Sequence, residues 1–136
     1  MRKSLDLARV LLVDDELPSR LTLQTLLRAG GYSVDVAGSA AEAFTMLDSG
    51  QYELVLSEAE MESPQAGLEV LSYARVRPYK PATALVTAYK EAKASRYPVG
   101  DQQHVSVNAE NVSALLGQVA DLIGMRVHRR ALRAAR

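Results

Sequence analysis

LVLSEAEMESPQAGLEVL, residues 54–71, is the stretch that decides the fold of this chain. Its first three residues are apolar, which is typical of a buried strand that ends at a short loop. Apolar residues then return with helical spacing at Val70, Leu71 and Ala74, inside a helix expected over 67–77. A buried strand followed by a helix is the repeating unit of α/β proteins. The stretch therefore places an acidic residue, Glu58, at the end of a strand.

Strand and helix signals alternate through the rest of the chain. Strands are expected over 9–15, 32–37, 53–57, 82–88 and, more weakly, 104–107. Helices are expected over 17–29, between residues 39 and 50, over 67–77 and from about residue 110 onward. Gly30 and Gly31 stop the first helix, and Ser39 with Glu42 forms a capping box that opens the second.

This alternation predicts an α/β fold: a parallel sheet with helices on both faces. The segments 9–15, 53–57 and 82–88 are continuously apolar, as interior strands of such a sheet are. The other two strands are alternating or weak, as edge strands are. The pattern fits a doubly wound, flavodoxin-like five-stranded sheet in the order 2-1-3-4-5, whose chemistry is located at the carboxyl ends of the strands.

Length and composition describe one globular domain. The chain has 136 residues and a hydrophobic fraction of 48%, which is enough for a buried core. It has no cysteine, so disulfides, thiolate metal sites and cysteine nucleophiles are excluded. The amino terminus has no signal-peptide pattern, and no apolar run approaches the ~20 residues of a membrane span. We therefore expect a cytoplasmic protein without membrane contact.

The formal net charge of zero conceals an uneven distribution. All 16 acids lie in residues 1–125, whereas residues 126–136 hold five arginines and no acid. We therefore expect an acidic domain over 1–125 and an arginine-rich extension of the last helix over 126–136. Arg126, Arg130 and Arg133 fall at i, i+4 and i+7. Such a helix could bind nucleic acid through phosphates, but the extension has no aromatic residue for base stacking. The alternatives are a solvated helix end or a helix that pairs in a dimer.

Four polar residues are expected together at the carboxyl ends of the central strands: Asp14, Asp15, Glu58 and Thr87. Carboxylates that converge with a hydroxyl in one crevice suggest a hard divalent cation, because Mg²⁺ is usually held by few carboxylates and several waters. The alternative is that Asp14 and Asp15 only cap the helix that follows them.

The chain resembles the receiver (CheY-like) domain of two-component response regulators. The matching stretches are VLLVDDELPSR, GYSVDVA, YELVLSEAEM, GLEVL and LVTAY, in the family's order and spacing from about residue 9 to residue 89. The resemblance implies phosphoryl transfer from a histidine kinase to an aspartate, assisted by Mg²⁺. It also implies that Asp14 and Asp15 are the metal-binding acidic pair and that Thr87 is the switch hydroxyl.

Three positions depart from the family pattern. The phosphoacceptor position is Glu58, whose extra methylene moves the carboxylate oxygens by about 1 Å, enough to slow a reaction that depends on positioning. A glutamate could instead imitate part of the charge of an aspartyl phosphate. The position of the family's lysine falls on Val107, and that of the aromatic switch residue falls on His104. The segment 89–101, where the family has a helix, contains Pro98 and no aliphatic stripe.

The acidic cluster implies weak metal binding. Two carboxylates ~5 Å apart repel by ~3 kcal/mol at an effective dielectric constant of about 20. Without the family's lysine, the cluster must bind a cation or hold a proton, so we expect weak Mg²⁺ or Ca²⁺ binding. The candidate ligands are Asp14, Asp15, Glu58 and Glu60, the last at a position whose backbone carbonyl joins the metal in the family.

These departures favour a pseudo-receiver that acts by protein–protein interaction without phosphorylation. Its expected partner is a histidine kinase or an output protein, and a homodimer through the last helix and its extension is also expected. Two alternatives stay open: a phosphorylatable receiver that uses Glu58, and a nucleic-acid-binding module that uses the arginine extension. An enzyme is not expected, because the chain has no Gly/Ser-rich phosphate loop and no nucleophile–base pair, and fold alone supports no activity.

Overall fold

A computed structural model describes residues 8–59, 61–88, 104–107 and 112–134. The helices and strands alternate as the sequence predicts. In chain order they are β1 (Arg9–Val13), α1 (Leu17–Ala29), β2 (Ser33–Ala37), α2 (Ala40–Ser49), β3 (Leu54–Glu58), α3 (Ala66–Arg75), β4 (Ala82–Ala88), β5 (His104–Val107) and α4 (Val112–Ala134).

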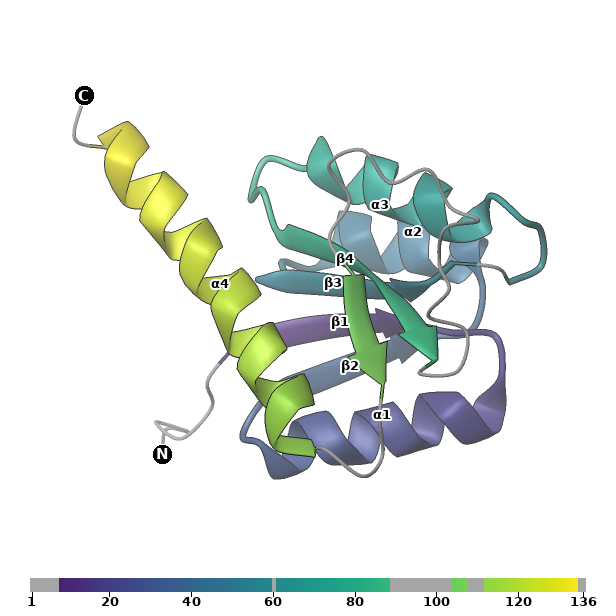
Figure 1. The fold of residues 1–136 in the computed structure, drawn as a ribbon. Helices are drawn as coiled ribbons and strands as arrows, with labels where there is room; N and C mark the ends of the chain where they lie inside the picture. Colours follow the sequence, from purple (N-terminus) through teal and green to yellow (C-terminus); the bar gives the residue numbers. More distant parts are fainter. Residues whose placement is uncertain (1–7, 60, 89–103, 108–111, 135–136) are drawn as a thin grey trace.

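The strands form one parallel sheet in the order β2-β1-β3-β4-β5, so the predicted fold class and strand order are confirmed. Figure 1 shows the helices on both faces of this sheet. The register pairs Val13 with Ser57 and Glu58 with Val86. It also pairs Ala88 with Val107, so the carboxyl ends of β1, β3, β4 and β5 lie along one edge.

Two hydrophobic cores hold the helices on the sheet. On one face α1 and α4 pack against alternate residues of the strands, through Leu27, Leu115 and Val119 among others. On the other face α2 and α3 do the same, with Leu47 and Leu71 fully or almost fully buried. The period-2 alternation of the strands therefore divides the apolar residues of β1, β3 and β4 between both cores, which is why these segments read as continuously apolar.

Side-chain hydrogen bonds to the backbone mark the ends of several helices and strands, and at β1 the end differs from the predicted one. β1 ends at Val13, two residues earlier than predicted, because the Asp14 side chain turns toward the start of α1. Ser39 caps α2 as predicted, since its hydroxyl accepts the Glu42 N–H at 3.1 Å. The Glu42 carboxylate accepts the Gly38 N–H at 2.7 Å, one residue before the usual partner in a capping box.

Gly67 allows α3 to begin directly against the end of β3. Its N–H donates to the Ala59 carbonyl at 3.0 Å. A Cβ at this position would lie 2.2 Å from the Glu58 carbonyl oxygen and 2.7 Å from that of Ala59. Only glycine permits so close an approach, so the packing of α3 against the end of β3 depends on Gly67.

The last helix, α4, extends beyond the part of it that packs against the sheet. α4 runs without interruption from Val112 to Ala134, and Figure 1 shows its carboxyl-terminal part projecting beyond the sheet. The predicted extension of the helix past residue 126 is thus observed, whereas the domain boundary at residue 125 stays a prediction. None of the helices in the described part of the chain has the length and apolarity that a membrane span requires.

Some predictions lie outside the described residues. These are the interrupted helix over 89–101, the role of Glu60 and the side chains of Thr87, His104 and Val107, whose backbones alone are placed in β4 and β5.

Candidate functional site

The sheet brings the predicted site residues to one edge. Asp14 and Asp15 follow β1 directly, and Glu58 is the last residue of β3. Thr87 lies one position beyond Val86, the partner of Glu58 in β4. Val107 ends β5 at the same edge, paired with Ala88. The backbone therefore gathers these positions as expected, while their roles stay predictions.

Asp14 holds the start of α1. Its side chain is 2% exposed, and Oδ1 accepts the Glu16 N–H at 3.0 Å. Oδ2 accepts the Ser19 hydroxyl at 2.5 Å. Glu16 is the N-cap residue of α1 but makes no cap with its own side chain, so Asp14 supplies that stabilisation from two residues upstream. The capping alternative thus describes the contacts of Asp14, whereas Asp15 is exposed.

These residues do not form a ready-made metal site. Among the residues that the structure describes, no three acids or imidazoles are grouped so that they could hold a metal ion. Both oxygens of Asp14 already accept hydrogen bonds from α1, so a cation bound there would compete with them. Glu58 is half-buried and has a partner of its own. The donor set of the described residues therefore does not fit Mg²⁺ in this arrangement.

The sequence prediction missed a cation at this edge. Arg20 is half-buried, and its Nη1 donates to the Asp14 carbonyl at 2.9 Å. The same nitrogen would lie 3.0 Å from a Cβ on Gly38, so the guanidinium covers the β2–α2 junction as well. Glu42 flanks it there, with Oε1 3.6 Å from the same Cβ position. The signal was present in VLLVDDELPSR, where Arg20 follows Glu16 by one helical turn.

The loop after β3 is tied to its neighbours by side chains. The Ser57 hydroxyl donates to the Glu58 carbonyl at 3.0 Å. Glu62 reaches across to α2, where Oε2 accepts the Ala40 N–H at 3.0 Å. A carboxylate at a helix N-terminus is stabilised both by this hydrogen bond and by the helix dipole. Glu62 therefore stabilises the start of α2 and fixes the loop that follows Glu58.

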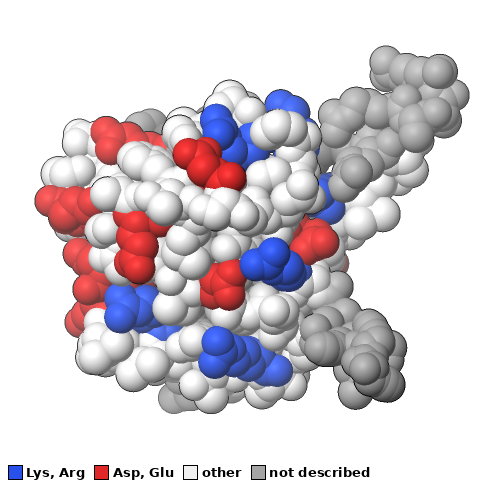
Figure 2. Space-filling view, turned by 180° about the vertical axis from the view of Figure 1, so that it is seen from behind, with Lys and Arg blue, Asp and Glu red and all other residues white. Residues whose placement is uncertain are grey.

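Charge is concentrated at this edge. Figure 2 shows acidic side chains gathered along the left side of the visible face, with basic side chains beside them and over the rest of the surface. The β1–α1, β2–α2 and β3–α3 junctions (residues 14–20, 37–42 and 58–67) contain one basic residue, Arg20. The carboxyl edge is thus an acidic surface with a cation held inside it.

Comparison with known proteins decides the family. The family model for the response regulator receiver domain matches residues 10–100. The chain belongs to this family. Response regulator receiver domains act in two-component signalling, so the resemblance seen in the sequence is confirmed.

The curated relatives of this receiver domain are much longer proteins. The alginate biosynthesis transcriptional regulatory protein AlgB of Pseudomonas putida is 36% identical over 81 residues, which is 60% of this chain and 18% of AlgB. The gliding motility regulatory protein of Myxococcus xanthus is 36% identical over 78 residues, 57% of this chain and 10% of that protein. The chain therefore spans less than a fifth of the length of these relatives.

Solved structures agree with the receiver fold. The response regulator TrrA of Thermotoga maritima, solved in complex with Mg²⁺-BeF, has a TM-score of 0.66 and 28% identity, covering 85% of this chain and 99% of TrrA. NtrX of Brucella abortus, in complex with ADP, has a TM-score of 0.81 but 16% identity, over 95% of this chain and 30% of NtrX. The second likeness concerns the fold alone.

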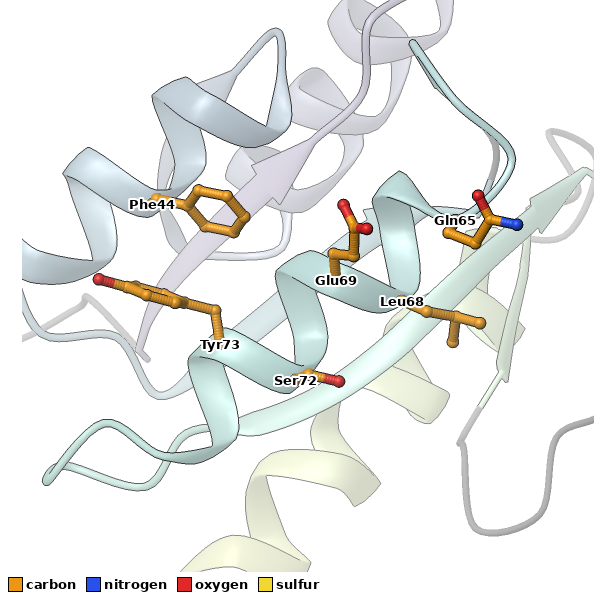
Figure 3. Close-up of a pocket in the computed structure, with 6 residues that line it drawn as sticks. All are labelled: Phe44, Gln65, Leu68, Glu69, Ser72 and Tyr73. Atoms are coloured by element: carbon orange, nitrogen blue, oxygen red, sulfur yellow. The ribbon is translucent and has the colours of Figure 1, made fainter.

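A shallow groove of about 560 Å³ lies on the α2–α3 face of the receiver domain. Figure 3 shows Phe44 of α2 facing Tyr73 of α3, with Leu68, Glu69 and Ser72 further along α3 and Gln65 just before its first residue. The two rings have centroids 4.7 Å apart. The Tyr73 hydroxyl donates to the Asp48 carboxylate at 2.8 Å, and this hydrogen bond raises the pKa of Tyr73. The position of the Tyr73 side chain in the groove is therefore fixed by its contacts with Phe44 and Asp48.

The opposite, amino edge of the sheet carries a second group of charges. The side chain of Arg126 is 7% exposed, and it donates to the carbonyls of Tyr79 and Lys80 at 2.9 Å each. Of the three arginines at i, i+4 and i+7, Arg126 is therefore directed into the body and not to solvent. Burial, and then a hydrogen bond to Asp35, raise the pKa of Tyr52 at the same edge.

Proposed function

We propose that this receiver domain is a pseudo-receiver, which acts by protein–protein interaction without phosphorylation. The observation that carries the proposal is Glu58 at the carboxyl end of β3, where the family has its phosphoacceptor aspartate. Its carboxylate stands one methylene further from the backbone than an aspartate would, and the close packing of Gly67 against the Glu58 carbonyl leaves little space for a compensating backbone shift. The commitment of Asp14 to α1 supports the same conclusion.

Incubation with acetyl phosphate and Mg²⁺, followed by intact mass measurement, tests this proposal. The wild-type protein is expected to gain no phosphoryl group. Glu58→Asp is the matched comparison, because it restores the aspartyl oxygen and changes nothing else. A phosphoryl adduct on the wild type that disappears in Glu58→Gln would overturn the proposal and favour the phosphorylatable alternative. TrrA, solved with Mg²⁺-BeF, is a suitable positive control.

We further propose that the protein partner is reached through α4, and that a second copy of the chain is one such partner. The outer face of α4 is exposed and carries residues at spacings of four and three: Ser113, Gly117, Ala120, Gly124, Val127 and Ala131. This is the repeat of a left-handed helix pair. Val127 is 56% exposed, and Cβ atoms on Gly117 and Gly124 would meet open space. A partner helix could therefore approach closely along this face.

Sedimentation velocity tests the self-association. Ala120→Glu is expected to dissociate the dimer, because it places a charge in the middle of the outer face. Gln118→Glu is the control, since Gln118 is exposed on a different side of the same helix. A wild-type protein that stays monomeric at high micromolar concentration would contradict the dimer without touching the proposal about Glu58.

A cytoplasmic location and a histidine kinase or output protein as partner belong to the same proposal. Weak Mg²⁺ binding belongs to it only with a rearrangement, in which Asp14 gives up its hydrogen bonds to the Glu16 N–H and the Ser19 hydroxyl. Nucleic-acid binding is the weaker alternative, because Arg126 is turned into the body and leaves fewer arginines for phosphates. A salt-dependent DNA shift that is lost on removing residues 127–136 would favour it.

A further inference from the structure

We propose that the groove between α2 and α3 is a docking site for the end of α4 from a second copy of the chain. The part of α4 that docks is the extension that follows Arg126, residues 127–136. This contact goes beyond the proposed function, because it uses the side of α4 that carries Leu132. The proposed helix pair uses the side that carries Ala120 and Val127, and five helical residues separate Val127 from Leu132, about 140° around the helix axis.

The groove has an apolar floor and an acidic margin. Phe44 and Leu68 are half-buried, Glu69 is exposed, and all three line the groove (Figure 3). Along α3 the lining positions run from Gln65 to Ser72 with the spacing of one helix face, so the groove extends for about 10 Å. That length matches about two turns of a helix laid in the groove, which is a common way of binding an amphipathic helix.

The part of the chain that forms the groove is acidic. Residues 29–74, which include α2 and α3, contain eight acids and no lysine or arginine. The charge of Asp48, which accepts the Tyr73 hydroxyl, is offset by Arg77 at 2.8 Å. Glu69 places its charge in the groove itself. A helix that brings an apolar side chain among cations therefore complements this surface.

The extension has that character. Residues 127–136 contain four arginines and no acid. Leu132 is 53% exposed, and His128, one turn before it, is exposed as well. Both lie in the continuous helix that ends at Ala134. The extension thus presents an exposed leucine on a basic helix, which matches the apolar floor and acidic margin of the groove.

The extension cannot enter the groove of its own copy. α4 packs on the sheet face whose core includes Leu27 and Leu115, whereas α2 and α3 cover the other face. The helix is uninterrupted to Ala134, and Figure 1 shows its end projecting away from the sheet. The groove that the extension meets must therefore belong to another copy, and each copy carries both halves of the contact.

Amide chemical shifts of the full chain test the inference. The ¹⁵N-labelled variant Leu132→Glu keeps the groove but disables its own extension, and it is titrated with unlabelled wild type. Saturable shifts are expected at Phe44 and over residues 65–73, and 0.5 M NaCl should weaken the binding severalfold. Unlabelled Leu132→Ser is expected to bind at least tenfold more weakly than the wild type, because it loses the apolar anchor but no charge.

The groove side has a matched pair of variants in the labelled chain. Adding Glu69→Lys is expected to weaken the binding about fivefold. Adding Asp121→Lys makes the same change of net charge at an exposed position of α4, so the affinity is expected to stay within about twofold.

Four results would overturn the inference. Shifts confined to α4 would leave the proposed helix pair in place but remove the groove as a docking site. Leu132→Ser as tight as the wild type, or Asp121→Lys as weak as Glu69→Lys, would show attraction by charge alone. A scrambled peptide of residues 127–136 that shifts the groove as strongly as the whole chain would make any basic segment an occupant, and not specifically a second copy. Since no phosphate donor is present, none of these results depends on the chemistry of Glu58.

Discussion

The two edges of the sheet differ in how their charged side chains are paired. At the amino edge, opposite charges and carbonyls are paired: Arg9 binds Asp35 at 2.9 Å, and Arg126 binds two backbone oxygens. At the carboxyl edge, several acids follow the strands, the half-buried Arg20 donates to the Asp14 carbonyl, and the Asp14 carboxylate accepts hydrogen bonds from Glu16 and Ser19. Paired polar groups contribute to stability, whereas unbalanced charge at strand ends is where receiver domains do their chemistry. We therefore expect charge substitutions to affect folding at the amino edge and binding at the carboxyl edge.

The largest expected effect comes from backbone packing at the carboxyl edge. Gly67→Ala is expected to lower the free energy of unfolding by about 3 kcal/mol, because the new Cβ would meet the Glu58 carbonyl. Urea unfolding monitored by circular dichroism measures it. Gly50→Ala is the control: a Cβ there would meet only Tyr52 at 3.6 Å and Arg9 at 3.7 Å, which are ordinary contacts, so a change within about 0.5 kcal/mol is expected. Equal losses in both variants would show that the contact at Gly67 is not limiting.

The second largest effect is expected at the amino edge, for the hydrogen bonds of Arg126. Arg126→Ala is expected to cost about 2 kcal/mol of unfolding free energy, because two part-buried backbone carbonyls lose their charged donor. Thermal unfolding measures the change, with Met125→Ala as the control, because Met125 is exposed on the same helix and lies outside the proposed dimer face. A loss below about 0.5 kcal/mol for Arg126→Ala would mean that water replaces the guanidinium and that this edge is not held by paired groups.

Tyr52 gives the amino edge a predicted pH dependence. Tyr52→Phe is expected to cost ~1 kcal/mol at neutral pH, because the hydrogen bond to Asp35 is lost. Burial raises the pKa of Tyr52 above its ordinary value of 10.0, so the folded state binds more protons than the unfolded state above pH 10. This stabilisation is present below pH 10 and is lost as the pH rises further. The gap between wild type and Tyr52→Phe should therefore narrow above pH 10 in urea unfolding, and a constant gap would contradict it.

The smallest effect is expected for a charge at the carboxyl edge. Glu62→Ala removes an exposed carboxylate that caps α2, so about 0.5 kcal/mol of unfolding free energy is expected to be lost. Ser39→Ala, which removes the principal cap of the same helix, should cost roughly twice as much. If Glu62→Ala proved the more costly variant, the loop after β3 would contribute more to folding than its exposure suggests.

Much of the fold followed from local sequence patterns. Strand order, helix faces and the arrival of Asp14, Glu58 and Thr87 at one edge depend on periodicity and on the geometry of parallel sheets, which neighbouring residues specify. The capping role of Asp14 could be anticipated as an alternative but not chosen, because an acid before a helix suits either a cap or a metal.

The side-chain contacts that complete the site could not be predicted in this way. Glu62 contacts a backbone group 22 residues away, and Arg126 one 46 residues away. Arg20 reaches both its own junction and Gly38 on the next loop. Such contacts depend on how the elements pack, and an arginine on an amphipathic helix gives no sign of which neighbour it will meet. For the same reason, the spacing of Arg126, Arg130 and Arg133 gives no sign that Arg126 is buried.

The hydrogen bonds of Arg126 to the Tyr79 and Lys80 carbonyls also set the position of any molecule that binds the end of α4. From Val127 to Ala134 the helix continues for about 12 Å, at 1.5 Å per residue, with its root fixed to the loop before β4. A molecule bound at the last turn of α4 would thus be held at a fixed distance from the sheet and in a fixed orientation to it.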